Sequence, residues 1–171
     1  MPDTRTEVIE RLLDSYRTYY NVSLYDEDQL PLRALCEYYE QAERYVIFRR
    51  ANLWTTQSEE FIYLYEMPVL TLELFEKCLA EAREAGMQLA HIGPGHMYTY
   101  ITPIFVCDSA EPDALKALKK TSIHKTFRFS FHGWMDVNLA VYEADSQTIT
   151  SNRAGKSVKK VLEKVIFSER G

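Results

Sequence analysis

The stretch "MYTYITPIFVCD", residues 97–108, decides the fold of this 171-residue chain. Apolar side chains occur at both its odd and its even positions. A strand that is apolar on both faces is typical of the centre of a sheet, so we expect a central strand here. Pro103 has no N–H to donate to a neighbouring strand, and we therefore also expect an edge or a bulge somewhere along this strand.

Three more strands are predicted before this one, at residues 33–39, 44–54 and 59–66. Short polar turns separate them, which indicates an antiparallel meander. The first of the three also fits a helical period, so a helix at 33–39 stays open as an alternative. Residues 21–31 are expected to form a loop.

Helical spacing of apolar residues predicts four helices. The first follows a capping box of Thr4 and Glu7, the second covers 71–85 and ends at Gly86, and the others cover 111–120 and 155–167. The resulting order, α-βββ-α-β-α-βββ-α, indicates an α+β fold. We expect a single domain over residues 1–171, with a largely antiparallel mixed sheet and helices packed on it.

The net charge of −5 is unevenly distributed along the chain. Residues 1–105 carry 9 Lys and Arg against 17 Asp and Glu, whereas residues 106–171 carry 11 against 8. The acidic total disfavours nucleic acid as a partner, while the basic C-terminal third leaves it open.

The three cysteines form no CxxC pair, which argues against a disulfide framework or a zinc site. The first residues lack the pattern of a signal peptide, and no apolar run approaches the length of a membrane span. We expect a cytoplasmic protein without a membrane partner.

The stretch "KTFRFSFHGWMDVNLAVYEA", residues 125–144, alternates apolar and polar side chains. Its phenylalanines at 127, 129 and 131 are expected to face the core. The alternation keeps its parity across Gly133, so the segment is either one strand kinked there or a hairpin with an odd-numbered loop such as 133–135. In that hairpin His132 would face Asp136, and in either case the polar side chains share one face.

These polar side chains are the first candidate site. An Asp beside a His fixes the imidazole tautomer and raises its basicity, so His132 and Asp136 are the candidate catalytic pair. Arginine can hold a carboxylate or a phosphate in a bidentate manner, and tryptophan offers a stacking surface. The candidate ligand-binding residues are Arg128, Ser130, Trp134, Asn138, His96, Tyr98 and Tyr100. Alternatively, a helix covers this face and the His and Asp only satisfy each other.

A second candidate site lies in "SNRAGKSVKK", residues 151–160, between a strand and a helix. Its Gly-Lys-Ser resembles the end of a phosphate-binding P-loop, but the required first glycine is replaced by Thr150. The remaining prediction is an anion held at the helix N-terminus by Arg153, Lys156 and Ser157. The alternative is that Ser157 or Asn152 only caps the helix.

The lysines of the last helix form a basic face that residues 117–125 could extend into a patch for a polyanion. His91 and His96 flank a tight turn, yet their spacing matches no metal-site signature, and we predict no metal.

The order α-βββ-α-β over about residues 3–107 resembles the core of the restriction-endonuclease-like PD-(D/E)XK nucleases. This resemblance implies magnesium-dependent hydrolysis through an Asp and an ExK motif. Glu59 and Glu60 occupy the corresponding strand, but no lysine follows at that spacing and no Asp precedes in the right place.

Three functions are consistent with these patterns. The preferred one is a non-catalytic binding module for a small anionic ligand or a protein partner, because the polar face lacks a complete catalytic motif. The second is a hydrolase or divergent metal-dependent nuclease that uses the His132 and Asp136 pair. The third is a structural subunit of a homo-oligomer, such as a homodimer, with Trp54, Trp134 and the tyrosine-rich strands at its interface.

Overall fold

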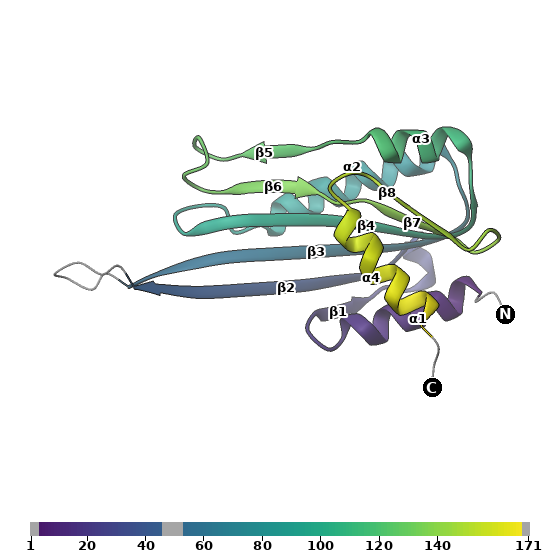
Figure 1. Ribbon diagram of the computed structural model, residues 1–171, viewed down its shortest axis with the longest axis horizontal. Helices are drawn as coiled ribbons and strands as arrows, with labels where there is room; N and C mark the ends of the chain where they lie inside the picture. Colours follow the sequence, from purple (N-terminus) through teal and green to yellow (C-terminus); the bar gives the residue numbers. More distant parts are fainter. Residues whose placement is uncertain (1–3, 46–52, 169–171) are drawn as a thin grey trace.

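The computed structural model describes residues 4–45 and 53–168 of the chain (Figure 1). Its helices and strands, in chain order, are α1 (Arg5–Tyr16), β1 (Asn21–Leu24), the 3₁₀ turn η1 (Glu27–Gln29), β2 (Leu32–Tyr45), β3 (Leu53–Leu70), α2 (Leu72–Leu89), β4 (His96–Ala110), α3 (Pro112–Lys120), β5 (His124–Thr126), β6 (Trp134–Val137), β7 (Ala140–Glu143), β8 (Thr148–Ser151) and α4 (Lys156–Phe167).

The strands in the described ranges form one mixed sheet, which confirms the predicted α+β class and element order. β1, β2 and β3 are an antiparallel meander, and β3 runs parallel to β4. On its other side β4 pairs in parallel first with β6 and then with β7, which are extended by the antiparallel strands β5 and β8. β4 is therefore the central strand, as its apolar sequence predicts.

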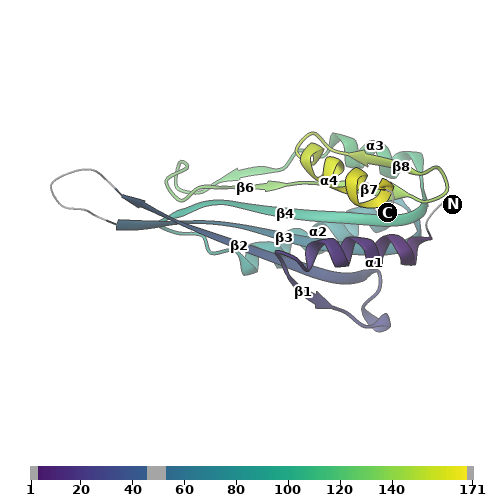
Figure 2. The same ribbon diagram turned by 60° about the horizontal axis from the view of Figure 1, so that its bottom comes forward.

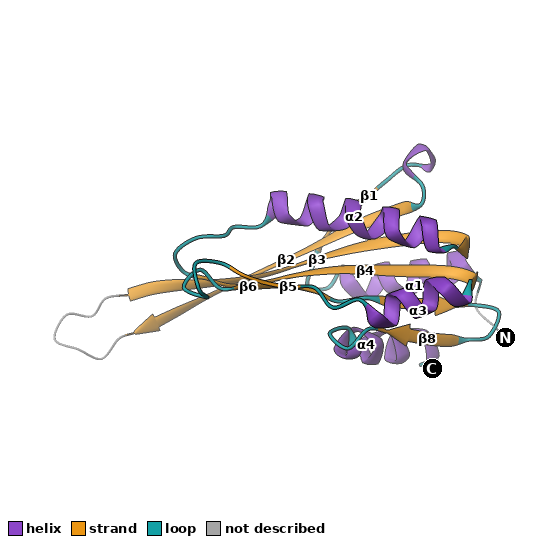
Figure 3. Cartoon of the chain, turned by 90° about the horizontal axis from the view of Figure 1, so that it is seen from above, coloured by secondary structure: helices purple, strands orange, loops and turns teal. Residues whose placement is uncertain are grey.

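The helices form a layer on each face of the sheet (Figures 2 and 3). α2 and α3 bury Phe75, Cys78 and Leu118 on one face, and α1 and α4 bury Leu12 and Leu162 on the other. Figure 3 shows that α1 and α4 cover only one end of their face, while the strands continue well beyond them. Part of that face therefore has none of the described helices over it.

Local signals place the helix starts. The Thr4 side chain accepts a hydrogen bond from the Glu7 N–H and the Glu7 carboxylate accepts one from the Thr4 N–H, completing the capping box.

The prediction that α2 ends at Gly86 is wrong, because the helix continues to Leu89. Gly86 is instead a packing position, where an added Cβ would lie 2.7 Å from the Ile101 side chain.

Three predictions about the first half of the sheet are corrected. Residues 21–31 are not only a loop, because 21–24 form the edge strand β1. Residues 33–39 belong to a strand and not to a helix. The strand predicted at 44–54 instead contains the end of β2 and the start of β3, and its middle, 46–52, lies outside the described residues.

Pro103 interrupts the sheet beside β4. The Ile101 carbonyl accepts a hydrogen bond from the Asn138 N–H, so this side of β4 faces β6 and β7. Two residues further along the same side stands Pro103, which has no N–H to donate. The neighbouring chain leaves the ladder there, between the end of β6 at Val137 and the start of β7 at Ala140.

The buried side chain of Asn152 closes this interruption. Its Oδ1 accepts hydrogen bonds from the N–H groups of Leu139 (3.0 Å) and Gly155 (2.8 Å). Its Nδ2 donates to the carbonyl oxygens of Val137 (3.1 Å) and Thr121 (3.0 Å). One amide thereby connects the broken strand, the end of α3 and the start of α4.

The predictions for residues 125–144 are largely wrong. The segment is neither one kinked strand nor a hairpin turning at 133–135, because β5 and β6 are joined by a loop over residues 127–133. Phe129 and Phe131 do not face the core: their exposed fractions are 96% and 83%. Arg128, Phe129 and Ser130 all adopt positive φ angles (46°, 54° and 73°), so strand alternation does not apply to them.

Replacing Asn152 with alanine should lower the free energy of unfolding by about 3 kcal/mol or more, because it leaves several buried backbone groups without partners. Chemical denaturation monitored by circular dichroism measures the change. The control Asn21→Ala, an exposed residue on β1, should change stability by less than about 0.5 kcal/mol. Equal stabilities for the two variants would contradict the role given to Asn152.

Candidate functional site

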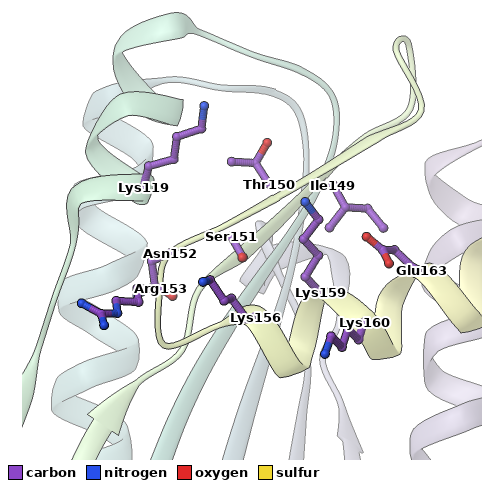
Figure 4. A pocket seen from close by; sticks show the side chains of 10 residues that line it. All are labelled: Lys119, Ile149, Thr150, Ser151, Asn152, Arg153, Lys156, Lys159, Lys160 and Glu163. Atoms are coloured by element: carbon purple, nitrogen blue, oxygen red, sulfur yellow. The ribbon is translucent and has the colours of Figure 1, made fainter.

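A basic pocket lies between α3, β8 and α4 (Figure 4). Its volume is about 560 Å³, which is within the range for small-molecule ligands. Its wall carries five cationic side chains and one carboxylate, that of Glu163. The cationic residues are Lys119, Arg153, Lys156, Lys159 and Lys160.

The pocket combines segments that are far apart in the sequence. Figure 4 shows Lys119 on α3 on one side of β8, and Lys156 and Lys159 on α4 on the other side. Two of the predicted anion-binding residues, Arg153 and Lys156, line this pocket, and the structure adds Lys119 from the 117–125 segment. Ser157 is exposed in the first turn of α4 but is not among the lining residues.

The electrostatics of the pocket favour an anion. Among the residues that the structure describes, no ion pair joins Lys119, Arg153 or Lys156 to an acidic group. The cap residue of α4 is Gly155, and no side chain in the described part of the chain caps the helix, so its first-turn N–H groups are available beside these cations. Peptide dipoles and free N–H groups at a helix start add to the attraction for a negative ligand.

Aromatic side chains gather on the part of the sheet that α1 and α4 leave uncovered. On β4, Tyr98 and Tyr100 stack with ring centroids 4.4 Å apart, and Trp134 of β6 lies 6.0 Å from Tyr98. Asp136 stands opposite Tyr100 and so shares their face. We call Tyr98, Tyr100, Trp134 and Asp136 the open face; all four were predicted site residues, and all four are half-buried.

Glu60 adds a second carboxylate beside the open face. It stands opposite Tyr100 on β3 and accepts hydrogen bonds from the hydroxyls of Tyr20 and Thr102. Burial raises the pKa of Glu60 above its usual value, and the two hydrogen bonds oppose that shift. Burial is also the main cause of the raised pKa of Tyr100, with smaller contributions from Tyr98 and Asp136.

Asp136 pairs with a different histidine from the one predicted. The hairpin register places His124 opposite Asp136, and its Nδ1 lies 2.6 Å from Asp136 Oδ1. His132 belongs to the 127–133 loop and contributes its carbonyl oxygen, 2.6 Å from the Nδ1 of His96. The prediction that His132 pairs with Asp136 is therefore wrong. The loop is centred at Ser130, four residues before the centre of the predicted 133–135 loop.

The other predicted ligand-binding residues are dispersed. Arg128 and Ser130 are exposed in the 127–133 loop and not on a strand. Asn138 is buried at the strand interruption. His96 is also buried, where it holds the loop through the His132 carbonyl. The predicted common polar face does not exist as one surface.

Sequence reasoning missed a buried polar network around Glu59. The Glu59 carboxylate accepts hydrogen bonds from the His91 N–H (2.7 Å) and the Thr99 hydroxyl (2.9 Å), and its other oxygen lies 2.8 Å from His91 Nδ1. The Thr99 hydroxyl also contacts Nε2 of His96 at 2.7 Å. Glu59 is completely buried, so this network positions the start of β4 and is closed to a ligand. Only the adjacency of Glu59 and Glu60 in a strand signalled that one of them faces inward.

Other chemistries have little support in the described residues. No group of three or more His, Cys, Asp or Glu side chains is placed there to hold a metal ion. Burial raises the pKa of the thiols of Cys36, Cys78 and Cys107 to about 12, which keeps them protonated and poorly nucleophilic near neutral pH. None of the helices that the structure describes has the length and apolar character needed to cross a bilayer.

The raised pKa of Glu60 predicts how stability depends on pH. As pH rises from about 4, Glu60 ionises in the unfolded chain before it ionises in the folded protein. The contribution of Glu60 to stability therefore decreases with rising pH, and it stays at its lower value once pH exceeds the folded pKa. The variant Glu60→Gln does not ionise, and its stability relative to the wild type should therefore increase between about pH 4 and pH 7. Denaturation curves across this range measure the difference, and parallel pH profiles for the two proteins would contradict the prediction.

Comparisons with known proteins give one result. Searches of curated proteins and of solved structures found no match, so the resemblance to the PD-(D/E)XK nucleases gains no support from a structural neighbour. A family model, "Domain of unknown function (DUF8052)", matches residues 4–164. This match covers nearly the whole chain, and the protein therefore belongs to the DUF8052 family.

Proposed function

We propose that this protein is a non-catalytic binding module whose ligand is a small molecule with several negative charges, held in the basic pocket. The observation that supports the proposal is the collection of five cationic side chains around one concavity with a single carboxylate. Bringing like charges together is unfavourable in the absence of an anion, so such clusters are typical of sites for anionic ligands.

Each part of the pocket has a distinct use in binding. Arg153 can form bidentate hydrogen bonds to a phosphate or carboxylate, whereas Lys119 and Lys156 act as compact charges from opposite sides. The first-turn N–H groups of α4 can donate to oxygens that the side chains leave free. This arrangement suits a phosphorylated small molecule.

The pocket contains groups for holding an anion but no arrangement for transforming one. Its wall has cations, one carboxylate, and the polar residues Thr150, Ser151 and Asn152, but none of the described residues that line it is a histidine or a cysteine. The Asn152 side chain is fully engaged in hydrogen bonds to the backbone. Binding without catalysis is the function that this set of groups supports best.

Isothermal titration with inorganic pyrophosphate at low salt tests the proposal. The wild type should bind, and the double variant Arg153→Ala/Lys156→Ala should bind at least about tenfold more weakly, since each charged hydrogen bond contributes about 1.5 kcal/mol or more. Bound pyrophosphate should also raise the melting temperature of the wild type by several degrees at saturation.

The matched control is Lys120→Ala, because Lys120 follows Lys119 on α3 but does not line the pocket. This variant should keep the wild-type affinity. Equal weakening by the control and by the double variant would mean that pyrophosphate responds to overall charge, and the pocket would then lose its assigned role.

A further inference from the structure

The loop over residues 127–133, which we call the Phe loop, presents two apolar side chains to solvent. Phe129 and Phe131 have the highest exposed fractions, 96% and 83%, among the large hydrophobic residues that the structure describes. Isolated exposed apolar residues are common, but two nearly bare aromatic rings in one short loop suggest a contact surface.

The base of the loop is firmly held while its tip is exposed. The N–H groups of Phe127 and His132 donate to the carbonyl oxygens of Gly133 (3.0 Å) and Phe127 (3.1 Å). The His132 carbonyl also lies 2.6 Å from Nδ1 of the buried His96. Phe127 packs against the core beneath, so Phe129 and Phe131 project from an ordered platform.

The backbone of the loop makes this exposure a fixed feature. Arg128, Phe129 and Ser130 have φ angles of 46°, 54° and 73°, a region that residues other than glycine rarely adopt. At Gly133 the φ angle is 77°, and an added Cβ would lie 2.1 Å from the Met97 carbonyl oxygen. The alternation in the sequence predicts that Phe129 and Phe131 lie in a strand and face the core. The backbone of the loop instead holds both rings outside the sheet.

The charges along the chain around the Phe loop are all positive. Residues 114–135 contain five Lys and Arg and no Asp or Glu. Arg128 is in the loop itself, and Lys125 precedes it with its ammonium nitrogen 5.6 Å from the Phe127 ring centroid. The nearest acidic residue along the chain, Asp136, is engaged with His124. Exposed aromatic rings with cationic side chains beside them complement a partner that has an anionic surface layer over an apolar interior.

We propose that the Phe loop anchors this protein to the surface of an anionic lipid bilayer. Phe129 and Phe131 enter the boundary between headgroups and acyl chains, while Lys125 and Arg128 contact lipid phosphates. This contact is peripheral and needs no spanning helix, and the proposal departs from the expectation of no membrane partner drawn from the sequence. The site is separate from the basic pocket.

Co-sedimentation of the full chain with vesicles tests this proposal. The wild type should bind vesicles of phosphatidylcholine mixed with phosphatidylserine and should bind vesicles of phosphatidylcholine alone more weakly. The double variant Phe129→Ser/Phe131→Ser should partition about tenfold less, because it loses the inserted rings. Arg128→Glu should weaken binding to the anionic vesicles by about fivefold or more.

Two control variants show whether vesicle binding is specific to the Phe loop. Tyr19→Ser removes an aromatic ring that is 78% exposed elsewhere on the molecule and should leave vesicle binding unchanged. Arg153→Ala/Lys156→Ala removes charge from the basic pocket and should also leave it unchanged, which distinguishes the two sites. Melting curves confirm that each variant is folded, and this is expected because the replaced side chains are exposed.

Insertion has its own signature. The variant Phe131→Trp should show a blue shift in fluorescence with anionic vesicles, and lipids brominated near the headgroup should quench the new signal. Full vesicle binding by the Phe129→Ser/Phe131→Ser variant would overturn the proposal, because attachment would then be purely electrostatic. The proposal would also be overturned if the wild type bound none of the vesicles. The exposed rings would then be assigned to contact with a protein partner.

Discussion

The hydrogen bonds of the Asn152 side chain are the interaction on which the rest of the structure depends. Pro103 lies in the central strand, where the neighbouring strand cannot complete its ladder. The Asn152 amide bonds to Leu139 and Val137 at this interruption, so buried backbone groups are not left unpaired. The same amide bonds to Thr121, after α3, and to Gly155, before α4. The basic pocket lies between those two helices, so the amide that closes the interruption also bonds to the backbone beside both helices of the pocket.

Local physical signals allowed much of the fold to be predicted from the sequence. The capping box of α1, the proline and lysines of α3 and the apolar spacing of α4 all depend on residues within a few positions of one another. The central position of β4 was also readable, because a strand that is covered by helices on both faces must be apolar on both. The edge strand β1 was not predicted, since it has only four residues and three of its side chains are exposed, so its brief alternation gave too weak a signal.

The 127–133 loop shows where sequence patterns cease to be informative. Strand alternation left open a kinked strand or a hairpin with an odd-numbered loop, and the structure has a hairpin of β5 and β6 with a seven-residue loop. Its centre, however, is at Ser130 and not at Trp134, which changes the partner of Asp136 from His132 to His124. Three consecutive residues other than glycine adopt positive φ there, and no propensity rule anticipates that. The predicted polar face failed for the same reason, because most of its residues lie in the loop or at the interruption and only Trp134 and Asp136 remain on a strand.

The distribution of charge connects the two proposed surfaces. The first 105 residues are acidic and build α1, β1 to β3, α2 and the first part of β4, while the basic remainder supplies both the pocket and the Phe loop. Arg153 and Lys156 are close in sequence and could be grouped by inspection, but Lys119 joins them only because α3 and α4 meet at β8. An acidic first part of the chain repels polyanions in general, so that attraction is restricted to the places where the basic part concentrates its charge. Selectivity for an anionic partner then arises from packing as much as from composition, because the same number of lysines spread over the surface would leave the net repulsion intact.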